Sequence, residues 1–231
     1  MSTGKQPASN ISIGIVLFPD LTLLDVAGPY EVFNRMPGRQ IHLVAASTEP
    51  IAAEGGLSIT PHTQFDNAPP FDILFVPGGP GQQGVMEDEH FLAFLREKAR
   101  AARLITSVCT GSLLLGAAGL LQGYRATTHW RYLELLGMLG AQPVSERVVI
   151  DRNRITGAGV SAGIDLALVI ASILFGETVA QEIQLMIEYD PRPPFHSGSP
   201  KSADAALVKR VSAALSERYE SRCRQIESRV H

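Results

Sequence analysis

Residues 104–116 constrain the fold more than any other part of this chain, because they read LITSVCTGSLLLG. A short, β-branched apolar run ends at Cys109, and a glycine- and leucine-rich segment of helical character begins immediately after it. This pattern predicts a strand, a sharp turn and a helix, with Cys109 at the corner. A thiol there lies at the positive end of a helix, which favours its thiolate form. An inert core cysteine is the alternative.

Strands alternate with helices along most of the chain, which predicts an α/β fold with a mainly parallel sheet and helices on both faces, a three-layer sandwich. Besides the strand that ends at Cys109, the predicted strands are 11–18, 40–46, 57–60, 71–76, 126–129, and a hairpin of 144–150 with 154–156. Besides a helix that ends near Gly123, the predicted helices are 24–36, 88–102, 132–139, 161–174 and 177–189.

The chain is predicted to hold one α/β domain, residues 11–200, between two extensions. Residues 1–10 are polar and lack the apolar core of a signal peptide, so we expect a disordered leader. A proline-rich arm, residues 190–200, ends the domain. Residues 201–231 form a charged, amphipathic helical extension. Its apolar side packs either on its own domain or on a partner subunit.

Composition excludes several classes of function. The net charge of −3 favours neither nucleic acid nor an anionic membrane surface as a partner. The two cysteines, Cys109 and Cys223, lie far apart, so a disulfide framework is not expected and the reducing cytoplasm is the default location. No cysteine–histidine cluster has zinc spacing, so no metal site is predicted.

Three segments are predicted to meet at the carboxyl edge of the sheet, where ligands bind in such folds. Cys109 would supply a nucleophile. The backbone N–H groups of Thr110 and Gly79 would stabilise a developing negative charge. Glycines at Gly78 and Gly79 leave room for a substrate, although a plain Pro-Gly-Gly turn is the alternative. The third segment carries Asp25.

Two further side chains are candidates for proton transfer. Asp25 lies inside the apolar stretch 21–26, so burial should raise its pKa and let it donate a proton near neutral pH. The alternative is a helix N-cap. His129 ends the predicted strand 126–129 and is either a base or, more commonly for such a residue, a structural histidine bonded to a backbone carbonyl. Cys223 lies among charges on an exposed helix and has no predicted role.

At these residues the chain resembles the ThiJ/PfpI superfamily, a flavodoxin-like group with a cysteine at a strand–helix elbow. The resemblance covers nearly all of residues 13–200. It implies a homodimer that needs no metal and no organic cofactor. Several matching segments also resemble the sensor half of AraC-type regulators. The matching segments are 17–19, 24–25, 28–29, 77–79, 107–112, 116–121, 126–130, 162–165, 193–195 and 198–200.

Differences within the superfamily favour its isocyanide-hydrating members. Protease- and deglycase-like members usually carry His after the cysteine and Glu as the acid, whereas this chain has Thr110 and Asp25, and it lacks the later His-x-Glu pair of class I glutaminases. The resemblance therefore implies a lyase that converts a small isocyanide into an N-substituted formamide. Cys109 would form a thioimidate, Asp25 would transfer protons, and Thr110 would orient Asp25 or water.

Two alternatives stay open. One is a cysteine enzyme of the glyoxalase or deglycase type that acts on an α-oxoaldehyde. The other is a non-catalytic sensor module related to AraC-type regulators. The helix expected beyond Pro200 is too short for the DNA-binding half of such a regulator.

Overall fold

The computed structural model describes residues 10–230, so the predicted leader lies almost entirely outside the described residues. A seven-stranded sheet forms the centre, in the order β10-β11-β7-β6-β1-β2-β5. Its pairs are parallel except the β10–β11 hairpin at one edge. The strands are β1 (Ile11–Val16), β2 (Arg39–Ala45), β5 (Thr63–Gln64), β6 (Ile73–Val76), β7 (Leu104–Val108), β10 (Val148–Asp151) and β11 (Arg154–Gly157). Two small sheets pair β3 (Ile51–Ala52) with β4 (Ser58–Ile59) and β8 (Arg125–Ala126) with β9 (Gln142–Pro143).

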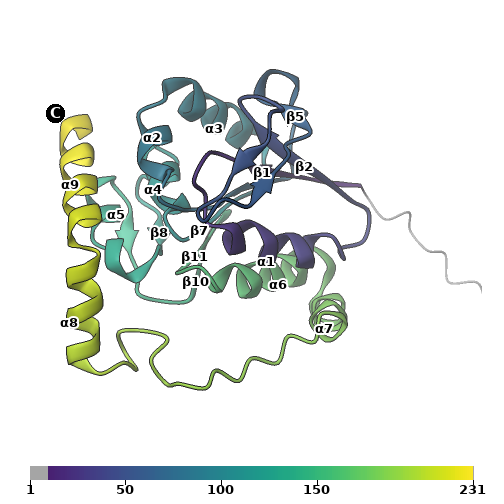
Figure 1. Cartoon of the computed structure of the whole chain (residues 1–231). Helices are drawn as coiled ribbons and strands as arrows, with labels where there is room; N and C mark the ends of the chain where they lie inside the picture. Colours follow the sequence, from purple (N-terminus) through teal and green to yellow (C-terminus); the bar gives the residue numbers. More distant parts are fainter. Residues whose placement is uncertain (1–9, 231) are drawn as a thin grey trace, which may run out of the picture.

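The central strands are buried along almost their whole length because helices cover both of their faces. Every residue of β6 and β7 is buried. Helices α1 (Leu23–Phe33) and α6 (Ala162–Phe175) pack together on one face of the sheet, and α2 (Gln82–Met86), α3 (Glu89–Ala101) and α4 (Gly111–Ala117) cover the other (Figure 1). The predicted three-layer α/β fold is confirmed.

The strand order creates a crevice at the carboxyl end of the sheet. Strand β1 pairs with β2 on one side and with β6 on the other, so the connections that follow β1 and β6 leave in opposite directions. The two loops are joined where the Thr22 N–H donates to the Gly78 carbonyl at 2.9 Å. The fold therefore brings the segment before Asp25 to the Pro-Gly-Gly loop.

Several predicted boundaries were wrong. Helix α4 ends at Ala117 and not near Gly123, because Gly119 and Gly123 adopt φ values of +76° and +70°, which a helix does not allow. The strand predicted at 126–129 is reduced to Arg125–Ala126. The helix predicted at 132–139 is divided into a 3₁₀ turn, η2 (Trp130–Tyr132), and α5 (Leu135–Met138). A second 3₁₀ turn, η1, covers Phe65–Asn67.

The C-terminal region contains two helices where one was predicted. They are α8 (Ala205–Ala214) and α9 (Ser216–Val230), and the chain reaches them from α7 (Glu177–Met186) through the exposed arm. The break falls at Leu215, whose φ and ψ of −102° and 5° leave the helical region. The Ser216 hydroxyl donates to the Ala213 carbonyl at the same point.

Helix α9 packs on its own domain. Ile226 is fully buried, and the Gln225 amide donates to the Gln83 carbonyl at 2.7 Å. Cys223 is half-buried, so its predicted exposed position was wrong. Helix α8, by contrast, has no buried residue. None of the helices between residues 10 and 230 combines the length and apolar character needed to cross a bilayer.

Candidate active site

Cys109 occupies the predicted corner between β7 and α4. Its φ of +55° is rare for a residue other than glycine and stores backbone strain. Hydrogen bonds hold the strained peptide: the Cys109 N–H donates to the Ala158 carbonyl at 2.7 Å, and the Thr128 hydroxyl donates to the Cys109 carbonyl at 2.6 Å. The predicted strand–turn–helix is confirmed, and the fold fixes the sulfur at one place.

Glycines let the loop after β6 approach this corner. A Cβ atom at Gly111 would lie 2.2 Å from the Val76 carbonyl oxygen, and one at Gly78 would lie 2.5 Å from the Thr110 nitrogen. Neither contact is sterically possible, so both positions require glycine. The Pro-Gly-Gly segment is thus part of the close packing around Cys109.

Asp25 is the third residue of α1 and its side chain is fully buried. One carboxyl oxygen, Oδ2, accepts the Gly78 N–H at 2.8 Å. The other, Oδ1, has no hydrogen-bond partner among the described residues. Thr22 is the N-cap of α1, so the capping alternative for Asp25 was wrong. Asp25 instead joins α1 to the glycine loop.

Burial raises the pKa of Asp25 from 3.8 to about 7. The Gly78 N–H and the Cys109 thiol oppose this rise, and the negative charge of Glu54 adds to it. The direction of this shift is the one predicted from the apolar stretch around Asp25. A carboxyl group with this pKa is able both to accept and to donate a proton near neutral pH.

The predicted thiolate at Cys109 is not the favoured state, because burial and the neighbouring Asp25 raise the pKa of the thiol well above its usual range. The Thr110 N–H and the charge of Arg222 act in the opposite direction. Cys109 is only 6% exposed, so desolvation outweighs the helix end. Asp25 therefore loses its proton before Cys109 does, and Cys109 remains a thiol near neutral pH.

The two predicted backbone donors are used differently. The Gly79 N–H donates to the Thr110 hydroxyl at 3.0 Å, whereas the Thr110 N–H lies at the Cys109 sulfur. The same hydroxyl donates to the Gly79 carbonyl at 3.3 Å. Thr110 thus ties the glycine loop to the corner, and its own N–H faces the reacting atom.

His129 lies beyond β8 in the wall of the site. Burial, followed by the charge of Arg222, lowers its pKa to about 4, so the ring is neutral at physiological pH. Its Nδ1 atom accepts the Arg131 N–H at 3.3 Å. This bond commits one ring nitrogen to a backbone N–H, and not to the backbone carbonyl expected for a structural His129. A direct role for His129 in catalysis stays a prediction.

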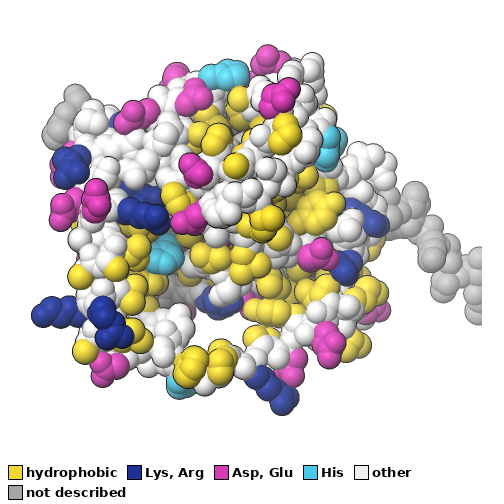
Figure 2. Space-filling view, in the orientation of Figure 1, with side chains coloured by type: hydrophobic (Ala, Val, Ile, Leu, Met, Phe, Trp, Pro, Cys, Tyr) yellow, Lys and Arg dark blue, Asp and Glu magenta, His cyan; other side chains and the backbone are white. Residues whose placement is uncertain are grey.

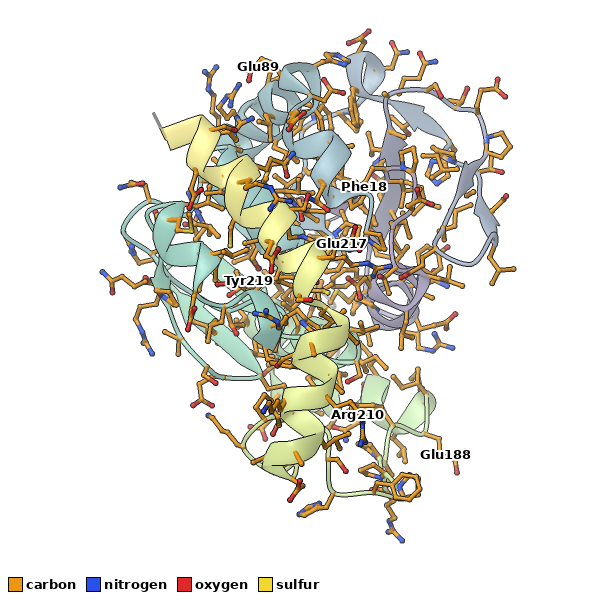
Figure 3. The ribbon with its side chains drawn as sticks, turned by 60° about the vertical axis from the view of Figure 1, so that its left-hand side comes forward. Phe18, Glu89, Glu188, Arg210, Glu217 and Tyr219 are labelled. Atoms are coloured by element: carbon orange, nitrogen blue, oxygen red, sulfur yellow. The ribbon has the colours of Figure 1, made fainter. Side chains whose placement is uncertain are left out.

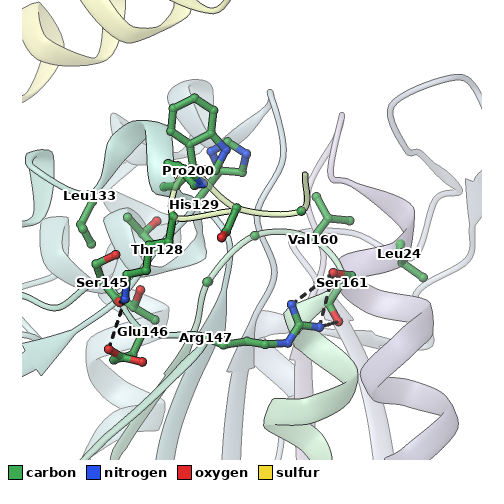
Figure 4. A pocket seen from close by; sticks show the side chains of 17 residues that line it. Leu24, Thr128, His129, Leu133, Ser145, Glu146, Arg147, Val160, Ser161 and Pro200 are labelled. Carbon is green, nitrogen blue, oxygen red and sulfur yellow. Dashed lines mark hydrogen bonds and ion pairs between the residues drawn. The ribbon is translucent and has the colours of Figure 1, made fainter. Parts of the chain in front are cut away.

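A cavity of about 530 Å³ opens beside these residues. Leu24, Thr128, His129 and Val160 line one side of it, and residues 198–200 of the arm, with Lys201 after them, line another (Figure 4). Leu24 adjoins Asp25 in sequence, and Thr128 is bonded to Cys109. Asp25 and Cys109 themselves do not line the cavity, so Leu24 and Thr128 are the lining residues that connect it to the pair.

Sequence reasoning missed two groups that shape this site. Residues 198–200 were predicted only as part of the proline-rich arm and Lys201 as part of the helical extension, although 198–200 match the superfamily and all four line the cavity. Arg222 of α9 is 2% exposed, and its charge reaches both Cys109 and His129. An arginine in a highly charged helix gives no sequence signal of this kind. Within residues 10–230, no cluster of three or more His, Cys, Asp or Glu side chains is placed to hold a metal ion.

Comparison with known proteins identifies the family. The DJ-1/PfpI family model matches residues 11–173, which is well over half of the chain. The chain belongs to the DJ-1/PfpI family. Arg222 lies outside the matched residues.

One curated relative, the isonitrile hydratase of Pseudomonas putida, is 51% identical over 214 residues, which cover 91% of this chain and 94% of that protein. The transcriptional regulator GbdR of Pseudomonas aeruginosa is 36% identical over 78% of this chain and 51% of its own length. A ThiJ/PfpI family protein from Pseudomonas syringae superimposes with a TM-score of 0.93 at 41% identity, over 95% of this chain and 92% of that one. The predicted superfamily and its flavodoxin-like fold are confirmed.

Proposed function

We propose that this protein is a lyase that adds water to an isocyanide (isonitrile), R–N≡C, and releases an N-substituted formamide. The proposal rests mainly on the 51% sequence identity to an isonitrile hydratase over 91% of the chain. The geometry of the site supports the same reaction, because a buried carboxyl group with a pKa of about 7 adjoins a buried thiol. Addition of a thiol to the isocyanide carbon needs both groups.

In the first half of the reaction, Asp25 takes the proton of the Cys109 thiol, and Sγ forms a bond to the terminal carbon of the isocyanide. Asp25 then returns the proton to that carbon, which gives the thioimidate R–N=CH–S–Cys109. The Thr110 N–H faces the sulfur and stabilises the negative charge there before the bond forms. The Gly78 N–H holds the carboxyl group in place.

In the second half, Asp25 accepts a proton from water while the water oxygen bonds to the thioimidate carbon, and Asp25 passes that proton to the nitrogen. The carbon–sulfur bond then breaks as the carbonyl forms, and Asp25 transfers the hydroxyl proton to the leaving sulfur, which restores the Cys109 thiol. The sum is R–N≡C plus water giving R–NH–CHO. No electrons are exchanged with another molecule.

The cavity would hold the R group. Leu24, Trp130, Leu133 and Val160 give its wall apolar surface, which suits an alkyl or aryl substituent. The isocyanide group itself is uncharged and linear. An uncharged group of this kind fits a buried site in which the pKa of the acid, Asp25, is near 7.

The deciding experiment exposes the purified protein to cyclohexyl isocyanide and, separately, to methylglyoxal, and measures the formamide and lactate produced. We expect formamide from the wild type and from Cys223→Ser, and none from Cys109→Ala. Lactate without formamide would favour the α-oxoaldehyde alternative. The absence of both products from a folded wild-type protein would favour the sensor alternative, which the GbdR match motivates.

We further propose that the protein acts as a homodimer in the reducing cytoplasm, where Cys109 stays a free thiol. Large apolar side chains are exposed at the end of α7 and in the arm, where Leu185 is 82% and Phe195 is 78% exposed. Figure 2 shows hydrophobic side chains around the hollow that the arm encloses. A second copy would cover this surface.

Analytical ultracentrifugation tests the dimer. The wild type should sediment as a dimer, and a variant with both Leu185→Ser and Phe195→Ser should sediment as a monomer. A monomeric wild type would contradict the proposal.

A further inference from the structure

Helix α9 carries a buried arginine to the edge of the catalytic site. Arg222 is 2% exposed, and its guanidinium stacks on the Tyr132 ring with Cζ 4.4 Å from the ring centroid. The centroid of the Tyr132 ring in turn lies 5.5 Å from the centroid of the His129 ring. Figure 3 shows α9, with Tyr219 on it, lying across the body of the domain. A continuous set of packed side chains thus leads from α9 to the cavity wall.

Arg222 is also tied to the glycine loop. Its Nε donates to the Gln82 side-chain oxygen at 2.7 Å, and Gln82 is fully buried. Gln82 begins α2 directly after the loop that contains Gly78 and Gly79. The guanidinium is therefore oriented by the same segment that holds Asp25 and Thr110.

The charge of Arg222 has no carboxylate partner among the described residues. A guanidinium stays protonated even when buried, and an unpaired buried charge is unfavourable. An opposite charge nearby offsets part of that cost. Cys109 is the nearby group that becomes an anion, and the two charges attract each other.

We propose that Arg222 is a positioning residue that acts through Cys109. Its buried guanidinium stabilises the thiolate of Cys109 after the proton has moved to Asp25. This inference rests on Cys109 being the nucleophile of the proposed function. Ionised Asp25 opposes a negative sulfur, whereas Glu54 acts on Asp25 by raising its pKa. The His129 ring is neutral, and around Arg222 itself Arg218 lowers the guanidinium pKa while Tyr132 raises it. Arg222 is then the side chain that offsets the cost of a thiolate in this site.

The test measures thiolate reactivity directly and does not depend on isocyanide turnover. In a Cys223→Ser background, the rate of Cys109 alkylation by iodoacetamide is followed by mass spectrometry across the pH range. We expect Arg222→Met to lower the rate at about pH 8 roughly tenfold, since a neighbouring cation commonly changes a pKa by one unit or more. Arg222→Lys keeps the charge and should recover part of the rate. The matched control is Arg224→Met, because Arg224 is exposed on the same helix.

A second variant covers the case in which Arg222→Met does not fold. Gln82→Glu would place a carboxylate against the guanidinium, so the helix contact remains while the charge of Arg222 is neutralised. It should lower the alkylation rate in the same direction. Circular dichroism and thermal melting establish that each variant is folded.

Wild-type alkylation rates in a folded Arg222→Met protein would overturn the proposal. An Arg222→Lys protein that reacts as slowly as Arg222→Met would also overturn it, because charge would then not be the cause. A lower melting temperature with an unchanged pH profile would show that Arg222 only supports the fold. Slower alkylation in a protein without isocyanide turnover would support the inference and contradict the proposed function.

Discussion

Replacement of Asp25 by Asn separates the energetic cost of this carboxyl group from its chemical use. Ionised Asp25 is unfavourable in the folded protein, because its pKa rises from 3.8 to about 7 on burial. At roughly 1.4 kcal/mol per pKa unit, that difference corresponds to about 4 kcal/mol. The contribution of protonated Asp25 to the free energy of unfolding is fully present below its pKa in the unfolded protein. It is lost as the pH rises through its pKa in the folded protein. Asn does not titrate and avoids this loss.

We therefore expect the free energy of unfolding of Asp25→Asn to exceed that of the wild type by about 2–4 kcal/mol at about pH 8, and to be near it at about pH 4. Isocyanide turnover should fall by roughly a hundredfold or more, because Asn transfers no proton. Urea unfolding at the two pH values gives the first quantity, and formamide production gives the second. A stability difference that does not change with pH would refute the raised pKa, and near-normal turnover would refute proton transfer by Asp25.

Three further outcomes follow from the same geometry. The kcat/KM value should rise with pH around a midpoint near 7, as the Asp25–Cys109 pair loses its first proton; a flat profile would contradict this. Gly111→Ala should destabilise the protein by about 2 kcal/mol in urea unfolding despite the usual helix preference for Ala, whereas Gly84→Ala, with open space around its Cβ, should be neutral or stabilising. Val160→Trp should raise KM about tenfold more for cyclohexyl than for methyl isocyanide, and equal changes would place the R group elsewhere.

The Cys109 corner and the burial of Asp25 were predictable because their signals are local. The apolar run before Cys109 and the small Gly111 after it suffice for a strand–turn–helix. The apolar stretch around Asp25 suffices for a raised pKa. Helix boundaries were harder to predict from the sequence. Either Gly119 or Gly123 could end α4, and the helix ends at Ala117, before the first of them.

The charge state of Cys109 was not predictable in the same way. The helix end favours a thiolate and is visible in sequence, but the opposing influences come from burial and from Asp25, which only the folded chain brings together. Arg222 is hidden for a similar reason. Its burial depends on contacts of α9 with Gln82 and Tyr132, which are far away in sequence.

These charges together favour an uncharged substrate. Once Asp25 has lost its proton, above a pH of about 7, the Asp25–Cys109 pair carries one negative charge and keeps one proton on Cys109. Arg222 adds one positive charge beside it, and His129, with a pKa of about 4, adds none. A charged ligand placed among them would disturb this balance at a buried site. An isocyanide carries no net charge, and its carbon becomes part of an ionic step only after the thiolate has formed.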